Sequence, residues 1–337
     1  MVNYGGAQYS GAYGTYDVYG AAASGGGYGA ASMFAPLQSK QGAMMVAPPG
    51  RKRRLNVVAI CLNVFVPWLI FCLVASMLSF EMHYAKPETV QAVIIVILAL
   101  AVLVGSLDVA YLYWKRQRGE GNFANATWLL FLCVCVLVAV GLAVPFGNRN
   151  FWANSQIFFD ITALNSYNGV DPSRMRGQEL MDAGRVLFAN GTHLDLSRSM
   201  GFRNVDTYCV APITGGAVVG NPLLASYDFW AVGKDCCSSN SADFRCGEYN
   251  NAEARAGMRL MRDSDRAFFR LAVQQAESAY GIKATHPLFF HWVRDPVAET
   301  YQYQQSAFQM YTVGMFGYFV LQVVLVFIGA SVFSKFA

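Results

Sequence analysis

The chain has 337 residues, of which 55 % are hydrophobic and only 14 % are charged. Soluble domains carry roughly 25 % charged residues, so this balance excludes an ordinary soluble protein. The net charge of +4 matters less as a total than through the places where the charges lie.

Residues 1–54 predict a disordered tail that ends in a basic cluster. The first 50 residues include eleven glycines and six tyrosines, and Asp17 and Lys40 are their only charged residues. Such a segment buries too little apolar surface to offset the entropy of ordering its backbone, so we expect a flexible tether. Its spaced tyrosines also suit weak multivalent contacts. The cluster consists of Arg51, Lys52, Arg53 and Arg54.

Four uninterrupted apolar runs follow, at residues 56–80, 90–114, 128–146 and 310–333. Crossing a hydrocarbon core of about 30 Å takes about 20 helical residues at roughly 1.5 Å each, so every run is long enough to span a membrane. We therefore predict an integral membrane protein, with transmembrane helices 1–3 in residues 55–146. Transmembrane helix 4 and a short cytoplasmic end are predicted in residues 310–337.

Basic residues gather on one side of these runs. The membrane-proximal basic cluster, residues 51–54, precedes the first run, while Lys115, Arg116 and Arg118 follow the second and Lys335 follows the fourth. Because cytoplasmic flanks collect Lys and Arg, both termini are predicted to be cytoplasmic, in the plasma membrane or an endomembrane. We interpret the cluster as a topology determinant that also attracts anionic lipid, and a specific lipid headgroup site is the rival interpretation.

The segment 147–309 is predicted to be an extracellular or lumenal α+β domain between spans 3 and 4. It carries 15 basic and 16 acidic residues, so it has no excess of positive charge that would attract nucleic acid. Asn190-Gly191 between two alternating runs predicts a β-hairpin. We also expect strands at residues 207–213 and 227–232, an amphipathic helix with a salt-linked arginine face at 251–280, and a second helix at 173–184.

The cysteines of this domain predict two disulfides. Cys209, Cys236, Cys237 and Cys246 make an even number on the predicted oxidising side of the membrane. Neighbouring residues lie only about 3.8 Å apart at Cα, below the usual disulfide range, so Cys236 and Cys237 are not expected to join each other. Cys209 and Cys246 should each pair with one of them. A four-cysteine zinc site is the rival, but no Cys-x-x-Cys element repeats.

No catalytic, cofactor-binding or metal-binding motif stands out. His286 and His291 are five residues apart, without the spacing and glutamate of a helical zinc protease motif, and we expect them to pack near the membrane-proximal end of the domain. Asn190-Gly191-Thr192 is a glycosylation sequon, which makes Asn190 a candidate glycan site. We predict neither enzymatic activity nor a cofactor nor a metal.

Polar residues within the spans indicate helix packing. Asn63 and Gln322 can hydrogen-bond between helices, and Asp108 lies near the cytoplasmic end of the second span. A single charged residue near one end of a span is a slender basis for an ion pathway. A channel or transporter subunit is therefore the alternative function, and an ectoenzyme is a less favoured one.

The predicted layout has a short first loop, a large second loop, four cysteines with an adjacent pair, and Asn63 in the first span. In these features the chain resembles tetraspanins. The chain departs from that family because Ser238 follows the pair, Cys209 precedes it, and the inner loop is long. The resemblance implies a protein that organises membranes through contacts with other membrane proteins.

A second resemblance covers most of residues 55–337 and leaves the function open, because that family has no assigned activity. It rests on the stretches 184–188, 194–197, 208–213, 227–233, 235–237 and 286–292. In these stretches the chain resembles a group of four-span membrane proteins from dinoflagellate-type algae. Together these observations predict a non-enzymatic membrane protein whose ectodomain binds other membrane proteins or a second copy of the chain, in the lipid bilayer.

Overall fold

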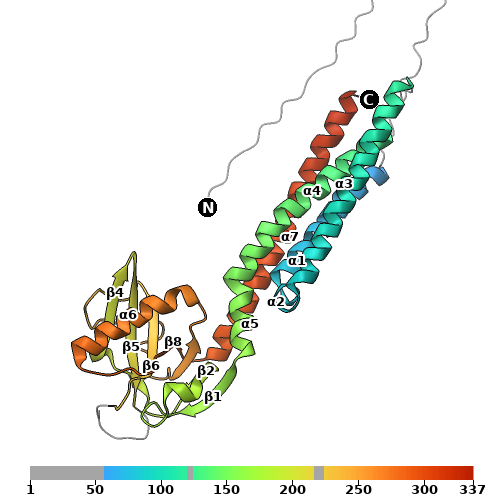
Figure 1. Cartoon of the computed structure of the whole chain (residues 1–337). Helices are drawn as coiled ribbons and strands as arrows, with labels where there is room; N and C mark the ends of the chain where they lie inside the picture. The colour runs from blue at the N-terminus through green and yellow to red at the C-terminus, as the bar shows by residue number, and fades with distance from the viewer. Residues whose placement is uncertain (1–56, 120–123, 216–223, 337) are drawn as a thin grey trace, which may run out of the picture. The chain divides into compact units, whose positions relative to one another are not determined.

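The computed structural model describes residues 57–119, 124–215 and 224–336. The predicted tail and the basic cluster Arg51, Lys52, Arg53 and Arg54 lie outside the described residues. The described residues form one set of long helices and one α+β domain (Figure 1).

Four of the described helices are long and apolar enough to cross a membrane, which confirms the prediction of four apolar spans. The helices run beyond the apolar stretches of the sequence. After α4, the helix continues through a π-helical turn, Phe151–Ser155, into α5, Gln156–Ala163. The others are α1 (Val57–Ser79), the short α2 (Glu81–Ala85), α3 (Pro87–Gln117), α4 (Ala124–Asn150) and α7 (Pro296–Phe336).

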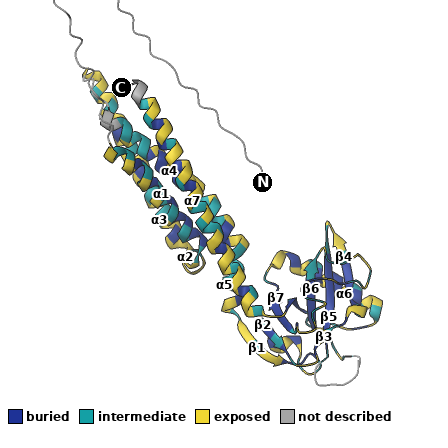
Figure 2. Ribbon diagram, turned by 180° about the vertical axis from the view of Figure 1, so that it is seen from behind, coloured by how far each residue is buried: buried dark blue, intermediate teal, exposed yellow. Residues whose placement is uncertain are grey.

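The long helices are apolar on the faces that pack and also on the faces that do not. Inside the bundle, the rings of Phe71 on α1 and Tyr318 on α7 stack with centroids 4.3 Å apart. On the outside, Leu107 is 61 % exposed and Phe327 is 74 % exposed, and Figure 2 shows such exposed positions along the helices. Helices that are hydrophobic all round are typical of a membrane span, because water would penalise the outer faces.

In the α+β domain, eight strands of the described chain form one mixed sheet with the order β1-β2-β7-β8-β6-β5-β3, and β4 pairs with β5. The pairs β1–β2 and β6–β8 are parallel, and the others are antiparallel. The strands are β1 (Asn165–Val170), β2 (Ala183–Phe188), β3 (His193–Leu194), β4 (Met200–Asn204), β5 (Asp206–Thr214), β6 (Phe229–Lys234), β7 (Ala256–Arg259) and β8 (Leu288–Val293).

Both faces of the central strands are buried. On β6, Trp230 and Val232 pack on one side, together with Phe269 and Val273 of α6 (Asp263–Tyr280). Ala231 and Phe229 point to the other side, where loops and the cysteines cover the sheet. Alternate side chains point to opposite faces of a strand, so a sheet covered on both sides needs the continuous apolar runs found here. Figure 1 shows α6 lying across the sheet.

Two strands are confirmed: the run at 207–213 is β5, and the run at 227–232 overlaps β6. The predicted hairpin is wrong. Gly191 does adopt a positive φ of 87°, but β2 pairs with β1 and β7 while β3 pairs with β5 at the far edge of the sheet. Asn190 lacks the positive φ that a type I′ hairpin turn needs at both central positions, and long-range pairing decides the partners of the two strands.

Both predicted helices of the domain need correction. Residues 173–184 contain a short 3₁₀ turn, Gly177–Leu180, and the start of β2. A Cβ on Gly177 would lie 2.2 Å from the carbonyl oxygen of His286, so this close approach to another loop replaces helical packing. The helix at 251–280 begins only at Asp263, because Ala256–Arg259 joins the sheet as β7 between β2 and β8. Sheet pairing overrides the helix propensity there.

Candidate functional site

The four cysteines of the domain form two adjacent disulfides at the end of β6. Cys209 joins Cys237 and Cys236 joins Cys246, with Cα atoms 5.8 and 5.2 Å apart. Gly233 makes room for them, since a Cβ there would lie 2.5 Å from the Cβ of Cys246. The neighbours Cys236 and Cys237 therefore take different partners, and together they link β5, the end of β6 and the following loop.

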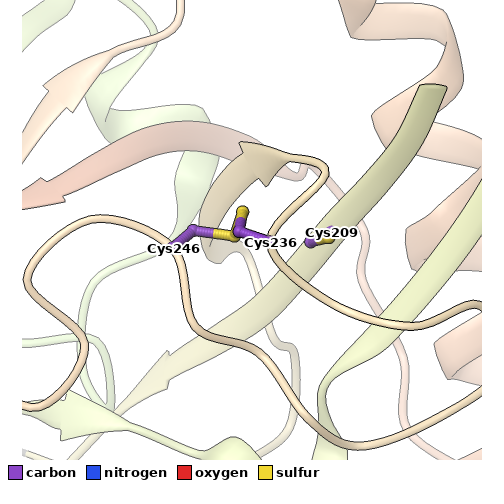
Figure 3. Close-up of side chains that lie close together, drawn as sticks. All are labelled: Cys209, Cys236 and Cys246. Atoms are coloured by element: carbon purple, nitrogen blue, oxygen red, sulfur yellow. A yellow bond between two sulfur atoms is a disulfide. The ribbon is translucent and has the colours of Figure 1, made fainter.

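Three sulfur atoms of this cluster lie close enough to resemble a metal site. Those of Cys209, Cys236 and Cys246 are all within 4.8 Å of one another (Figure 3). Zinc binds deprotonated thiolates, whereas each of these sulfurs is already bonded to another sulfur. The cluster therefore acts as a pair of covalent links in its oxidised form.

The candidate glycan site is accessible. Asn190 is exposed in the turn after β2, and its Oδ1 accepts a hydrogen bond from Nη1 of Arg255. Thr192, the third residue of the sequon, has a buried side chain. The asparagine can thus be reached from solvent, while the threonine is covered by the folded domain.

The two histidines of the His286–His291 stretch do not come together. His286 contacts the side-chain amide of Gln178, whereas His291 is half-buried on β8 and lines a cavity. Burial lowers the pKa of His291. The two imidazoles therefore have different surroundings, one in the loop before β8 and the other on β8 in the cavity wall.

A buried carboxylate that the sequence analysis did not single out holds three segments together. Oδ1 of Asp228 accepts hydrogen bonds from the hydroxyl of Ser226 at 2.6 Å and from the amides of Thr285 and His286 at 3.0 and 3.1 Å. Its Oδ2 accepts one from the amide of Gly177 at 3.0 Å. Burial raises the pKa of Asp228, but these hydrogen bonds outweigh burial and hold its pKa below the usual value. The only sequence signal was an aspartate at the start of an apolar strand.

Of the two predicted interhelical side chains, only that of Gln322 bonds across helices, whereas the side-chain amide of Asn63 donates to the carbonyl of Ala59 within α1. The side-chain amide of Gln322 on α7 donates to the carbonyl oxygen of Asn63 on α1 at 2.7 Å. Pro67 explains this contact, because it has no N–H with which to bond the carbonyl four residues earlier. Gln322 thus satisfies an acceptor that would otherwise lie unpaired in an apolar bundle. Tyr318 donates to its Oε1 at 3.1 Å.

The third polar candidate, Asp108, lies apart from that pair. Its side chain is buried on α3, and its Oδ2 has no hydrogen-bond partner among the described residues. A carboxylate buried in this way is costly, so it is a feature that helix packing alone does not explain.

A cavity of about 610 Å³ lies where the helices meet the α+β domain. One wall comes from the π-helical turn, α5 and α7, and includes Trp152, Ile157 and Tyr303. The opposite wall comes from the ends of β6 and β7, from β8 and from the start of α6, and includes Lys234, Arg259, Met261, Asp265 and His291. Its volume is typical of small-molecule sites.

Comparisons with family models, with curated proteins and with solved structures found no match for this chain. The two resemblances therefore remain predictions.

Proposed function

We propose that this chain is a non-enzymatic, multi-pass membrane protein whose α+β domain binds another membrane protein, in a role similar to that of tetraspanins. The proposal rests on the conformation and exposure of Val205, the single residue between β4 and β5. Its φ is 64° and its side chain is 94 % exposed. Figure 1 shows the β4 end of the sheet pointing away from the rest of the domain.

A valine is energetically unfavourable at this tip. A β-branched side chain rarely adopts a positive φ, and such strain costs about 1–3 kcal/mol. Glycine or asparagine would adopt this backbone conformation with less strain, and the valine side chain makes almost no contact with the rest of the domain. An exposed apolar side chain held in strained backbone is suited to contact with a partner.

Photo-crosslinking from the tip tests this proposal. A photo-activatable residue replaces Val205 in one variant and Met181 in the control, because Met181 is also apolar and 65 % exposed but has an ordinary φ of −64°. In native membranes we expect one discrete adduct from position 205 and none from 181. An adduct of twice the 37.0 kDa chain mass identifies a second copy, and any other mass identifies a different protein.

A glycine variant links the strain to the recognition. Val205→Gly should stabilise the domain by about 1 kcal/mol, because it relieves the positive φ. With the photo-activatable residue placed instead at Asp206, next to the tip, the same glycine substitution should abolish the adduct. A stabilised variant that still forms the adduct would contradict the proposed role of Val205.

The proposed orientation places both termini in the cytoplasm and the α+β domain outside the cell or in a lumen. Lys115, Arg116 and Arg118 at the end of α3 support it, and so do the two disulfides, which persist in oxidising compartments. Asn190 then becomes available for a glycan. A glycosidase-sensitive mass shift that Asn190→Gln removes would support this orientation, and disulfides that are reduced in intact cells would contradict it.

A channel or transporter subunit is a second candidate, favoured by Asp108. Its buried carboxylate oxygen has no hydrogen-bond partner within the described ranges, and such groups mark ion or proton paths in other membrane proteins. Reconstitution into liposomes tests this function. Ion or proton flux that Asp108→Asn abolishes would support it, and the absence of flux from correctly folded protein would remove it.

A further inference from the structure

The cavity between the helices and the α+β domain contains a cation without a counter-ion. Three acidic side chains line it, and two of them form ion pairs with other residues. Asp265 lies 2.8 Å from Lys234 and 3.7 Å from Arg262, and Asp263 lies 3.0 Å from Arg266. The third, Asp160, is a neighbour of Tyr84 and forms no ion pair with any described residue, Arg259 included.

Arg259, on β7, is the cation left over. It makes no ion pair with any described residue, and its Nη1 is buried without a hydrogen-bond acceptor among them. Burial and the nearby charge of Arg266 lower its pKa to about 10. An unpaired buried cation is unfavourable, so a bound anion would stabilise this arrangement.

Part of the cavity wall is apolar. Trp152, Ile157, Met261 and Tyr303 line the same cavity, and its volume of about 610 Å³ exceeds what a single inorganic ion fills. A ligand that suits both parts of the wall has one anionic group and an apolar portion.

We propose that this cavity binds an anionic amphiphile, with its carboxylate or phosphate on the guanidinium of Arg259 and its hydrocarbon portion against the aromatic and aliphatic wall. The planar guanidinium suits such groups because it donates two parallel hydrogen bonds to them. This binding site is separate from the proposed partner contact at Val205. The ligand reaches the cavity either from the surrounding lipid or from the aqueous phase.

Equilibrium dialysis of radiolabelled octanoate against the full chain tests the site. The protein is held in nanodiscs of phosphatidylcholine, and empty nanodiscs give the background partition into lipid. We expect saturable binding of one octanoate per chain, while octyltrimethylammonium, which has the opposite charge, binds no better than to empty discs. No saturable octanoate binding, or equal binding of the cation, would overturn the proposal.

Two variants assign the binding to Arg259. Arg259→Gln keeps a long polar side chain without the charge and should weaken octanoate binding by about ten- to a hundredfold. The matched control, Arg270→Gln, removes an exposed arginine of α6 that does not line the cavity and should leave the affinity unchanged. Equal affinities for the two variants would refute the assignment.

A third variant keeps the test decisive if Arg259→Gln fails to fold. Gln156→Trp fills the cavity from the α5 side while Arg259 stays in place, and it should also abolish saturable binding. Octanoate binding that survives this substitution would place the ligand elsewhere.

Competition experiments show whether the ligand enters from the bilayer or from water. If the cavity opens to the bilayer, adding phosphatidic acid to the nanodiscs should displace octanoate. If it opens to water, octyl phosphate in solution should displace octanoate and phosphatidic acid should not. Displacement by neither would contradict the proposed chemistry.

Discussion

At the scale of single residues, the buried polar groups of this protein divide into those with partners and those without. Asp228 and the carbonyl of Asn63 have partners contributed by distant segments, whereas the Oδ2 of Asp108 and the Nη1 of Arg259 have none within the described parts of the chain. A buried polar group without a partner costs about 1–3 kcal/mol, and more when it is charged. Among the buried side-chain atoms without a partner in the described residues, only those of Asp108 and Arg259 belong to charged groups, and for these two residues we propose a function beyond folding.

Asp228 is predicted to be a stabilising residue whose contribution disappears in acid. Asp228→Ala leaves the amides of Gly177 and His286 without this acceptor and leaves that of Thr285 only the hydroxyl oxygen of Ser226, so it should destabilise the α+β domain by about 3 kcal/mol. Hydrogen exchange of the β6 amides in nanodiscs measures this loss. Asp206→Ala is the control, because its carboxylate is partly exposed and only pairs with Lys234 at 3.5 Å, so it should cost less than about 1 kcal/mol.

The pH dependence of the same residue follows from its depressed pKa. An unfolded aspartate has a pKa of about 3.9, and the folded value of Asp228 lies below its usual range. The folded state therefore binds fewer protons than the unfolded state. Its stabilisation is fully present above about pH 4 and is lost as the pH falls through the folded pKa. In Asp228→Asn this part of the acid destabilisation should be missing, and an unchanged pH profile would contradict the assignment.

At the scale of elements, helix packing depends on two local exceptions to regular helix structure. Pro67 leaves a carbonyl of α1 free, which Gln322 of α7 satisfies, and Gly147 lets α4 approach α1 closely. In an isolated helix, the proline and the glycine would both be destabilising. In the bundle, each allows a contact with a neighbouring helix.

The proline and the glutamine are predicted to be coupled. Gln322→Leu should destabilise the bundle by about 0.6–2 kcal/mol in a bicelle unfolding titration. In a Pro67→Ala background, residue 67 regains its N–H and bonds the Asn63 carbonyl within α1, so the same substitution should cost measurably less. Gln91→Leu, at an exposed position of α3, is the control and should have no such cost. Identical costs in both backgrounds would refute the coupling.

Two glycines of α4 make a matched pair for testing helix approach. A Cβ on Gly147 would lie 2.6 Å from the Cβ of Leu78 and 3.3 Å from the carbonyl oxygen of Ala75, so Gly147→Ala should force α1 and α4 apart. The expected cost is about 1–3 kcal/mol. A Cβ on Gly141 would meet nothing within 4 Å, so Gly141→Ala should be neutral or slightly stabilising. The same bicelle titration measures both, and a larger effect at Gly141 would contradict this packing.

At the scale of the whole molecule, the two disulfides hold the far side of the sheet against its loops. They should contribute unequally, since closing a longer loop removes more entropy from the unfolded chain. The Cys209–Cys237 bond closes a separation of 28 residues and the Cys236–Cys246 bond one of 10. In this view the first contributes about 3.6 kcal/mol and the second about 2.7 kcal/mol.

Paired serine substitutions test that order. Replacing Cys209 and Cys237 together should lower the thermal midpoint of the α+β domain more than replacing Cys236 and Cys246 together. Each pair is removed as a unit, so that no single free thiol remains to exchange with the other bond. An excess of a thiol reductant, which cleaves both disulfides, should lower the thermal midpoint of the wild-type domain below the midpoints of both variants. The reverse order of midpoints would show that strain or residual structure, rather than loop closure, controls the stability.

The sequence by itself determined the features that depend on local composition. Four helices long enough to span a membrane follow from continuous apolar runs, and β5 and the core of β6 follow from short β-branched and aromatic runs. The separation of Cys236 from Cys237 follows from the length of one peptide unit. Each of these features is set within one segment, so no knowledge of the rest of the fold was needed.

Only the tertiary structure decided the features that depend on a distant partner. It turned Ala256–Arg259 into a strand, sent the residues after Asn190-Gly191 to the far edge of the sheet, and brought Gln322 to the carbonyl that Pro67 leaves free. It also placed Arg259 in a cavity where two of the three acidic side chains already pair with other cations. In each case the outcome depends on contacts between two segments that are far apart in the chain. The sequence of either segment alone does not specify those contacts.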